Sequence, residues 1–384
     1  MRTKALDSSN EILNWWNREK ERLSNFLVPI IAIIVGFLVT GIMIALSGKD
    51  PFAAYTLLFK GAIGGSFQEI ITLKVSGEGL LKGAILTLTG LSVAVAFNVG
   101  LFNIGAEGQF IIGAIVAAYL GFKLNMSPWI NFPIIFIAVA VISGLYGALA
   151  GWLKIKRGVH EVITTIMLNW IAINLVENWL VVGPFSIEKY QPTSFLAGTP
   201  YVKDASRLKP FFSATRLNAS IIIAVVAVIF VYILLSKTVL GYEIRATGKN
   251  PKAAKYAGIN TGRAMVTAMF IAGALAGISG ACMILGTEGR YPGVFRPGYG
   301  FDGITMALIG GSGAIGTFFA AIFFGLVRGG ATGMQLMGIH KTFTDIIQGV
   351  ATLFVAGQVG IKFLLYRIGE KRPLTKEVAK SAND

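Results

Sequence analysis

The sequence predicts an all-α fold, a polytopic membrane helical bundle of about ten transmembrane helices (about eight to ten) with a broken helix or re-entrant segment. Three observations predict it. Hydrophobic residues make up 54% of the 384 residues and charged residues only 14%, whereas a soluble domain carries about 25% charged residues. The mean hydropathy of +0.68 leaves too few polar side chains to cover a water-facing surface. Apolar runs of roughly 20 residues, enough to cross about 30 Å of hydrocarbon, recur along the chain.

The apolar runs give the expected spans in chain order. The continuous ones are 26–46, 80–98, 106–122, 129–152, 161–183, 218–236, 264–286 and 343–361. The stretch 303–335 is also apolar, but a glycine-rich turn interrupts it. We expect a short helix over 303–311 and a longer helix over 314–335, which gives about ten spans. About eight or nine spans with re-entrant pieces is the alternative interpretation.

The ends of the chain differ from its middle. Residues 1–25 are mostly polar and precede a run long enough to span a bilayer, so we do not expect a cleavable signal. Apolar and polar residues alternate there in a way that predicts an amphipathic helix on the cytoplasmic membrane surface. A disordered basic tail is the alternative. Residues 26–368 form the expected transmembrane domain, and 369–384 a cytoplasmic tail.

The basic residues indicate the orientation of the chain, whose net charge is +15. Four segments on the side of the N-terminus hold 20 of the 34 lysines and arginines; they are 1–25, 153–160, 237–263 and 362–384. Because cytoplasmic loops are enriched in Lys and Arg, both termini are expected to be cytoplasmic. The opposite loop 184–217 conflicts mildly with this pattern, since it also carries basic residues. Its prolines still favour a folded external loop.

Composition and motifs exclude several function classes. His160 and His340 are the only histidines and Cys282 the single cysteine, so neither a His/Cys metal site nor an internal disulfide is expected. Nucleic-acid binding is not expected, because the sequence has no stripe of basic residues interleaved with aromatic ones. A membrane-embedded enzyme is not expected, because the sequence has no metal set, no nucleophile–base pair and no paired carboxylates at a useful spacing. The phosphate-binding pattern G-x-x-x-x-G-K-[ST] is also missing, so ATP-driven transport would need a separate ATPase subunit.

Polar residues interrupt the apolar pattern at 97–109. Asn98, Asn103, Glu107 and Gln109 lie there among glycines. Charges inside membrane segments are costly and usually functional, and irregular backbone at that depth is either packed in protein or lines a wet cavity. Asn and Gln offer both donors and acceptors, which suits hydroxyl-rich or heterocyclic substrates. The segment is either part of a substrate pathway or a polar turn on the cytoplasmic side.

A second polar group begins the span 161–183. Glu161, Thr165 and Asn169 are spaced by four residues, which places them on one helix face. Such a stripe faces a pathway or provides hydrogen bonds between helices. Asp302 and Asp345 lie near helix starts, where a carboxylate complements the helix dipole. For these two we expect a structural role.

The cytoplasmic loop 237–263 contains signals for a short helix. Asn250 is an N-cap residue and Pro251 takes the first helical position. Gly258 stops the helix, as glycine commonly does. Such a helix, carrying small residues, could dock into a groove on another protein. An ordinary connector between spans is the alternative.

Three motifs, at 100–109, 158–169 and 248–259, together resemble those of a known family. The chain resembles the transmembrane permease subunits of ABC importers of the ribose and branched-chain-amino-acid type. Within that superfamily it is most similar to the nucleoside and simple-sugar permeases, which work with a basic-membrane-protein-type lipoprotein. The likeness covers roughly residues 26–368.

The resemblance implies an importer with two permease subunits, which often differ, and two ATPase subunits that hold ATP and Mg²⁺. This chain would bind no cofactor. An extracellular lipoprotein would deliver a nucleoside, with purine nucleosides expected, and the complex would lie in a bacterial plasma membrane and work by alternating access. The implied contacts with the ATPase are Gly248, Asn250, Pro251, Ala253, Ala254, Gly258 and Ile259. The expected substrate pathway is Asn98, Asn103, Glu107, Gln109, Glu161, Thr165 and Asn169.

Two other transport functions stay open at this point. One is an ABC permease for a simple sugar such as ribose. The other is a secondary transporter that uses Glu107 or Glu161 as an ion or proton site, because buried carboxylates serve in proton relays.

Overall fold

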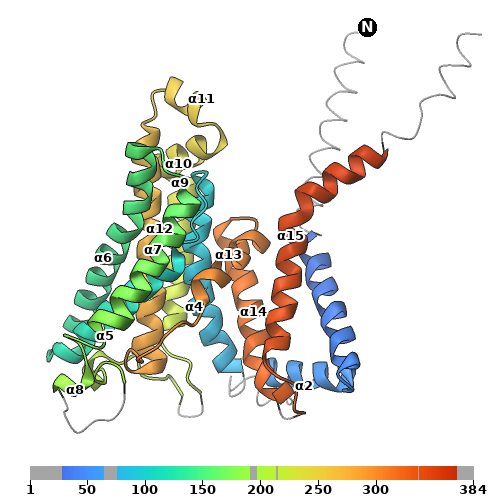
Figure 1. Cartoon of the computed structure of the whole chain (residues 1–384), viewed down its shortest axis with the longest axis horizontal. Helices are drawn as coiled ribbons and strands as arrows, with labels where there is room; N and C mark the ends of the chain where they lie inside the picture. The colour runs from blue at the N-terminus through green and yellow to red at the C-terminus, as the bar shows by residue number, and fades with distance from the viewer. Residues whose placement is uncertain (1–27, 65–75, 191–196, 213–214, 336, 370–384) are drawn as a thin grey trace, which may run out of the picture. The chain divides into compact units, whose positions relative to one another are not determined.

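The computed structural model describes residues 28–64, 76–190, 197–212, 215–335 and 337–369 (Figure 1). The expected amphipathic segment 1–25 and all of the tail 369–384 except residue 369 lie outside them. Helices and the loops between them make up the described residues, whose only β-type pairings are two isolated bridges, Gly198 to Pro292 and Pro210 to Asn218. The prediction of an all-α fold is confirmed for this part of the chain.

The chain divides into two compact units, residues 42–345 and residues 1–41 with 346–384. The smaller unit contains most of helix Val28–Leu46 and most of α15 (Thr342–Gly369). Within it Gly36 packs so closely on Ile347 that an added Cβ would lie 2.7 Å from the Ile347 carbonyl oxygen. The main helices of the larger unit are α2 (Pro51–Ile63), α4 (Ser76–Asn98), α5 (Ala106–Lys123), α6 (Pro128–Arg157), α7 (Glu161–Asn174), α9 (Ser220–Lys237), α10 (Val239–Lys249), α11 (Pro251–Tyr256), α12 (Thr261–Met283), α13 (Tyr299–Ile309) and α14 (Ala314–Gln335).

Helix α4 is the buried centre of the larger unit. It is apolar around its whole circumference, and residues such as Leu88 are fully buried, as expected for a helix without a polar face. α12, α13 and α14 pack against it. A Cβ on Gly325 of α14 would lie 2.3 Å from the Gly83 nitrogen, and one on Gly113 of α5 would lie 2.3 Å from the Gly277 oxygen of α12. Small residues therefore let these helices approach at backbone distance, as they do in membrane proteins generally.

Six helices of the described residues are long and apolar enough to cross a membrane. They are Val28–Leu46, Ser76–Asn98, Pro128–Arg157, Ser220–Lys237, Thr261–Glu288 and Ala314–Gln335. Each coincides within a few residues with an expected span. The expected count of about ten is not confirmed, because four expected spans, 106–122, 161–183, 303–311 and 343–361, are not among these six helices. The chain is a multi-pass membrane protein with a helical bundle.

The expected break between 311 and 314 is present. α13 ends at Ile309, Gly310 caps it, and α14 begins at Ala314. Gly311 and Ser312 between them take positive φ angles of 63° and 58°. The left-handed conformation of two consecutive residues turns the chain sharply and separates the short helix from the long one.

Two of these main helices were not expected from the sequence. α2 follows Asp50, whose side chain accepts a hydrogen bond from the Phe52 nitrogen at 2.9 Å. α10 occupies much of the segment 237–263, which we expected to be a loop around one short helix, and Thr238 caps its start. Both are far shorter than a membrane span, so a search for long apolar runs does not detect them.

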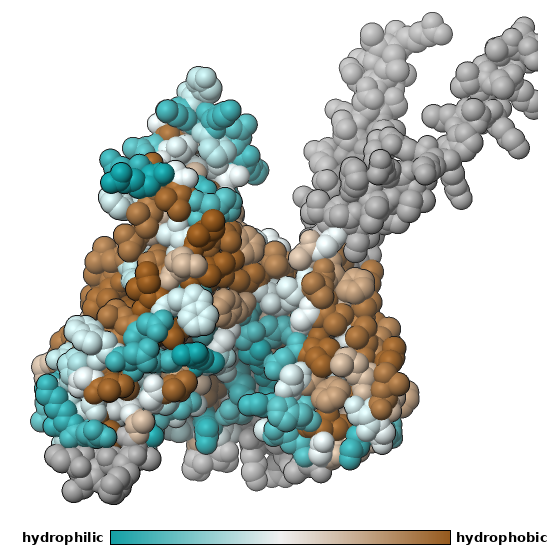
Figure 2. All heavy atoms as spheres, in the orientation of Figure 1, coloured by the Kyte–Doolittle hydropathy of each residue, from teal (hydrophilic) through white to brown (hydrophobic). Residues whose placement is uncertain are grey.

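The molecular surface of the larger unit has an apolar band. Figure 2 shows hydrophobic side chains over α6 and α7, and hydrophilic ones at the end that carries α10 and α11. Ile137 and Ile163 on these helices are 65% and 59% exposed. Apolar surface of this extent is typical of contact with lipid rather than with water.

Candidate functional site

The polar segment between α4 and α5 is stabilised by hydrogen bonds among its own side chains and backbone groups. Asn103 and Gln109 are at most 1% exposed and exchange two hydrogen bonds of 3.0 and 3.2 Å. Asn103 Oδ1 also accepts from the Gly105 nitrogen at 3.0 Å. Gly100 takes a φ of 79°, which favours glycine. The two amides thus stabilise the irregular backbone between the two helices.

Asn169 of α7 joins this cluster from the second predicted motif. Its Oδ1 accepts from the Gly108 nitrogen and its Nδ2 donates to the Ile104 oxygen, both at 2.8 Å. Gly108 is required here, because an added Cβ would lie 2.8 Å from Asn169 Oδ1. One buried amide therefore ties α7 to the start of α5 and satisfies backbone groups that the break leaves unpaired.

Thr165 and Glu161 occupy the earlier turns of α7. Thr165 lies beside Gly105, since a Cβ there would be 3.1 Å from Thr165 Cβ. Its hydroxyl donates to the Glu161 carbonyl at 2.8 Å. The Glu161 carboxylate instead forms an ion pair with Lys154 at the end of α6. The structure therefore brings Asn103, Gln109, Thr165 and Asn169 together, and it gives Glu161 a separate partner.

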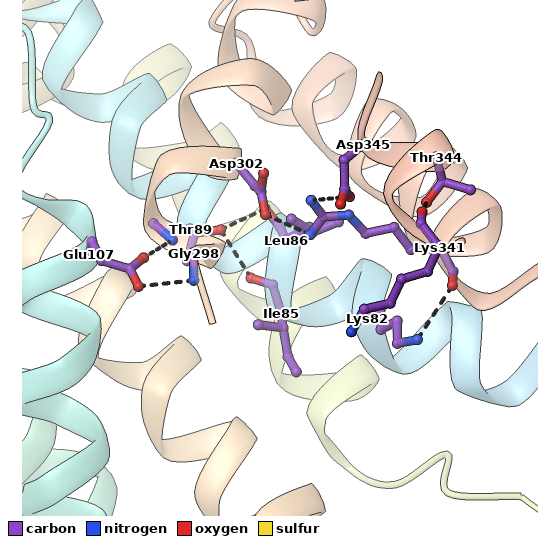
Figure 3. Close-up of polar contacts among 12 residues, drawn as sticks. Lys82, Ile85, Leu86, Thr89, Glu107, Gly298, Asp302, Lys341, Thr344 and Asp345 are labelled. Carbon is purple, nitrogen blue, oxygen red and sulfur yellow. Dashed lines mark hydrogen bonds and ion pairs between the residues drawn. The ribbon is translucent and has the colours of Figure 1, made fainter. Parts of the chain in front are cut away.

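Glu107 holds the beginning of α13. Its carboxylate is 2% exposed and accepts hydrogen bonds from the Gly298 and Gly300 nitrogens at 3.0 and 2.7 Å (Figure 3). The first N–H groups of a helix have no partner within the helix, and the helix dipole favours a negative charge there. Gly300 permits the contact, because an added Cβ would lie 2.2 Å from the Glu107 nitrogen.

A second buried carboxylate holds the residues just before α13. Glu177 lies in a π-helix, Leu175–Leu180, that continues α7, and it is 5% exposed. It accepts from the Phe295 nitrogen at 3.0 Å and from Arg296 Nη2 at 2.8 Å. π-Helical turns occur frequently at functional sites. Glu107 and Glu177 together hold the entry to α13 from two neighbouring helices.

Asn98 lies apart from the other predicted pathway residues, at the far end of α13. Its Nδ2 donates to the Ser312 carbonyl at 2.9 Å, in the turn between α13 and α14. Its backbone contacts α10, since a Cβ on Gly248 would lie 2.2 Å from the Asn98 oxygen. Asn98 also lines a cavity of about 490 Å³ with Ser312 and Arg245. It connects α10, α4 and the α13–α14 turn.

The segment 248–259 has the expected short helix. Asn250 Oδ1 accepts from the Ala253 nitrogen at 3.0 Å, and α11 runs from Pro251 to Tyr256. Gly258 ends it with a φ of 83°. Ala254 packs inward at 4% exposure, whereas Tyr256 is 94% exposed. Figure 1 shows α11 at the end of the bundle, beyond α10. The helix is free on its outer face within the described residues, as a docking element would be.

A polar cavity of about 250 Å³ lies beside the start of α13. Lys82, Tyr299, Arg328, Gln335, Lys341 and Asp345 are among the residues that line it. Arg328 forms ion pairs with Asp302 at 2.5 Å and with Asp345 at 3.3 Å (Figure 3). The two aspartates lie in the first turns of α13 and α15, as expected, but they also bind this arginine.

None of the predicted pathway residues lines this cavity, and the sequence pattern had not marked its basic residues Lys82, Arg328 and Lys341 or, elsewhere, the buried Glu177. Asp345 had been marked, but only for a structural role. A signal was present. Lys82 and Arg328 lie inside the expected spans 80–98 and 314–335, and Glu177 lies inside 161–183. The rule that marked Glu107, that a charge inside a membrane segment is usually functional, applies equally to these three.

Comparison with known proteins places the chain. Residues 75–356 match the family described as branched-chain amino acid transport system / permease component. The guanosine ABC transporter permease protein NupP of Bacillus subtilis is 35% identical over 91% of this chain and 99% of its own length. The nucleoside ABC transporter permease protein NupB of Lactococcus lactis is 34% identical over 88% and 92%. The glucose ABC transporter permease protein TsgB13 of Haloferax volcanii is 29% identical over 89% of each chain.

In Bacillus subtilis and Lactococcus lactis a second permease whose name gives the same solute also matches, at 26% and 25% identity. No solved structure matches the chain significantly. The family match covers the helices from α4 into α15, including both polar motifs, the α13–α14 break and the capped helix α11. The chain belongs to the branched-chain amino acid transport system / permease component family.

Proposed function

We propose that this chain is the permease subunit of an ATP-driven importer that moves nucleosides, with purine nucleosides as the first expectation, across a bacterial plasma membrane. The observation that carries the proposal is the similarity, along nearly the whole length, to permeases named for guanosine and for nucleosides. ATP and Mg²⁺ would be held by a separate ATPase, and this chain would bind no cofactor of its own. An extracellular lipoprotein would deliver the solute.

The contacts around α10 and α13 support a route for alternating access. α11 would dock on the ATPase through 248–259 and move with it. Gly248 passes that motion to Asn98 by direct backbone contact, and Asn98 is bonded to the Ser312 carbonyl. The α13–α14 turn would move in response, and α13 would shift against the carboxylates that hold its other end. Because packed interfaces switch between discrete arrangements, a small displacement at α11 can alter the far end of α13.

The other proposed features follow from the same comparison. Two different permeases for one solute in each of two organisms support a heterodimeric pair of permeases. The excess of Lys and Arg in 237–263 and in the two terminal segments supports a cytoplasmic location for all three. Of the predicted pathway, Asn103, Gln109, Thr165 and Asn169 would shape the broken segment beside the moving helix.

Two alternatives can be compared with the same observations. A simple sugar as substrate is supported by the relative named for glucose. Ion-coupled secondary transport would require a carboxylate that is available to an ion. Glu107 is engaged by two backbone N–H groups and Glu161 by Lys154, which argues against that mechanism.

Uptake by cells tests the proposal. Labelled guanosine, cytidine and ribose are offered to cells with and without this chain, in the presence of its ATPase, partner permease and lipoprotein. We expect loss of nucleoside uptake without the chain, and loss in complete cells after ATP depletion. If only ribose uptake is lost, the substrate is ribose and not a nucleoside. Uptake that survives ATP depletion would overturn the ATP-driven mechanism.

A further inference from the structure

The polar cavity beside α13 combines charged groups with an aromatic wall. Three cations surround it, Lys82, Arg328 and Lys341. Lys82 lies 3.5 Å from Glu78, and Arg328 is paired with both Asp302 and Asp345. Three carboxylates, Glu78, Asp302 and Asp345, therefore balance the three cations, and the cavity has almost no net charge.

A balanced charge favours a neutral ligand over an ion. An anion would compete with carboxylates that already hold Arg328, and a cation would compete with the arginine itself. A hydroxyl group donates and accepts at the same time, so it can bridge a carboxylate and an ammonium without displacing either. Lys341 has no carboxylate within ion-pair distance among the described residues, and the side chain of Gln335 is exposed beside it in the lining. Both retain free hydrogen-bonding capacity toward such a ligand.

The wall of the cavity supplies apolar contact. Tyr299 is 7% exposed and stacks on Phe110, with ring centroids 6.1 Å apart. Phe110 in turn stacks on Phe295 at 6.2 Å. Binding sites for small organic molecules commonly combine aromatic walls with a few placed polar groups. The cavity's volume of about 250 Å³ corresponds to about eight waters at roughly 30 Å³ each. That space is sufficient for a pentose ring.

We propose that this cavity binds the ribose moiety of the transported solute, with Asp345, Lys341 and Gln335 hydrogen-bonded to its hydroxyl groups. The inference rests on the proposed nucleoside transport and assigns the part of the solute that the permease recognises. The base would extend out of the cavity. Selectivity at this cavity would then depend on the 2′- and 3′-hydroxyls and not on the base.

The chain is well suited to a direct test, because its single cysteine, Cys282, is buried at 0% exposure. Gln335→Cys and Lys341→Cys each place a reactive thiol at the cavity, and Lys60→Cys places one on the exposed surface of α2, outside the lining. The complete importer is assembled in membrane vesicles. The rate of labelling by a small maleimide is measured with saturating guanosine, 2′,3′-dideoxyguanosine or ribose, and uptake by each variant is recorded in parallel.

Guanosine is expected to slow labelling at both cavity positions by roughly tenfold or more and to leave Lys60→Cys unchanged. The dideoxy compound should protect much less, because each lost hydroxyl contact reduces affinity by up to about tenfold. Equal labelling rates with and without guanosine, in vesicles that transport it, would overturn the proposal and leave nucleoside transport standing. If the importer carries ribose and not guanosine, the proposed substrate fails, whereas protection by ribose would still support the cavity assignment.

Discussion

At the scale of single residues, several polar side chains buried among the described spans form hydrogen bonds with backbone groups. Asn103, Asn169 and Glu107 each accept from main-chain nitrogens of a segment that is irregular or begins a helix. An unpaired backbone N–H in a membrane interior costs several kcal/mol, so these side chains are part of the fold before they are part of any mechanism. The effect of replacing one of these side chains depends on which backbone N–H group loses its hydrogen-bond partner.

Glu107→Gln should destabilise the permease. The substitution removes the negative charge at the α13 N-terminus and turns an amide N–H₂ toward the Gly298 or Gly300 nitrogen, which leaves one buried donor unsatisfied. We expect a loss of about 1–3 kcal/mol, measured as a lower thermal unfolding temperature of the detergent-solubilised importer, with reduced uptake. Glu188→Gln, at an exposed position, is the control and should leave both unchanged. An unaltered unfolding temperature for Glu107→Gln would contradict the bonds drawn in Figure 3.

Gly248→Ala tests the contact between α10 and α4. The added methyl would lie 2.2 Å from the Asn98 oxygen, so the two backbones must separate. Overpacking of this kind costs about 1–3 kcal/mol. We expect uptake to fall while the chain still reaches the membrane. Gly262→Ala, whose nearest neighbour would be 3.4 Å away, is the matched control. Similar uptake by the two variants would remove Gly248 from the proposed route.

At the scale of elements, α13 is the part of the larger unit best suited to move. It is short, glycines in left-handed conformations precede and follow it, and polar side chains hold both ends. A cavity lies at each end, one lined by Tyr299 and one by Ser312. Long helices such as α4 and α12 are instead fixed by contact along their whole length. The exposed helix α11 is the element through which a partner would act.

Gly258→Val should uncouple ATP hydrolysis from uptake. Gly258 has a φ of 83°, which a β-branched residue adopts only with strain, so the end of α11 would change direction. We expect the assembled complex to retain ATPase activity and to lose most uptake. Gly349→Val, where an added Cβ meets no atom within 4 Å, carries the same substitution as a control. Both activities falling together would indicate failed assembly, and unchanged uptake would show that α11 does not couple them.

At the scale of the whole molecule, an ABC transporter permease works together with other protein chains. The described part of the chain has a polar cavity, the exposed helix α11 and an apolar surface. The proposed heterodimer predicts that this chain and the ATPase, with lipoprotein but without the second permease, give no nucleoside uptake. Adding the second permease should restore uptake, measured with labelled guanosine in cells that lack their own transporter. Full uptake without it would show that two copies of this chain suffice.

Much of the fold could be predicted because its signals are local. Span positions follow from apolar runs, and α4, α12 and α14 lie within a few residues of the expected ranges. The cap at Asn250 and the stop at Gly258 follow from backbone preferences of single residues. α2 and α10 were missed because they are too short for a span. The fold class does not depend on either of them.

The sequence by itself determined that this is a helical membrane protein, the position of six of its spans, the break after α13 and the short helix α11. All of these depend on hydropathy or on backbone preferences that neighbouring residues decide. Only the tertiary structure decided what the polar residues do. Glu107 binds Gly298 across 191 positions and Asn98 binds Ser312 across 214, and no local pattern contains such pairings. The cavity beside α13 likewise exists only where α4, α13, α14 and the start of α15 meet, because a hydrogen bond or an ion pair depends on distance in space and not on separation along the chain.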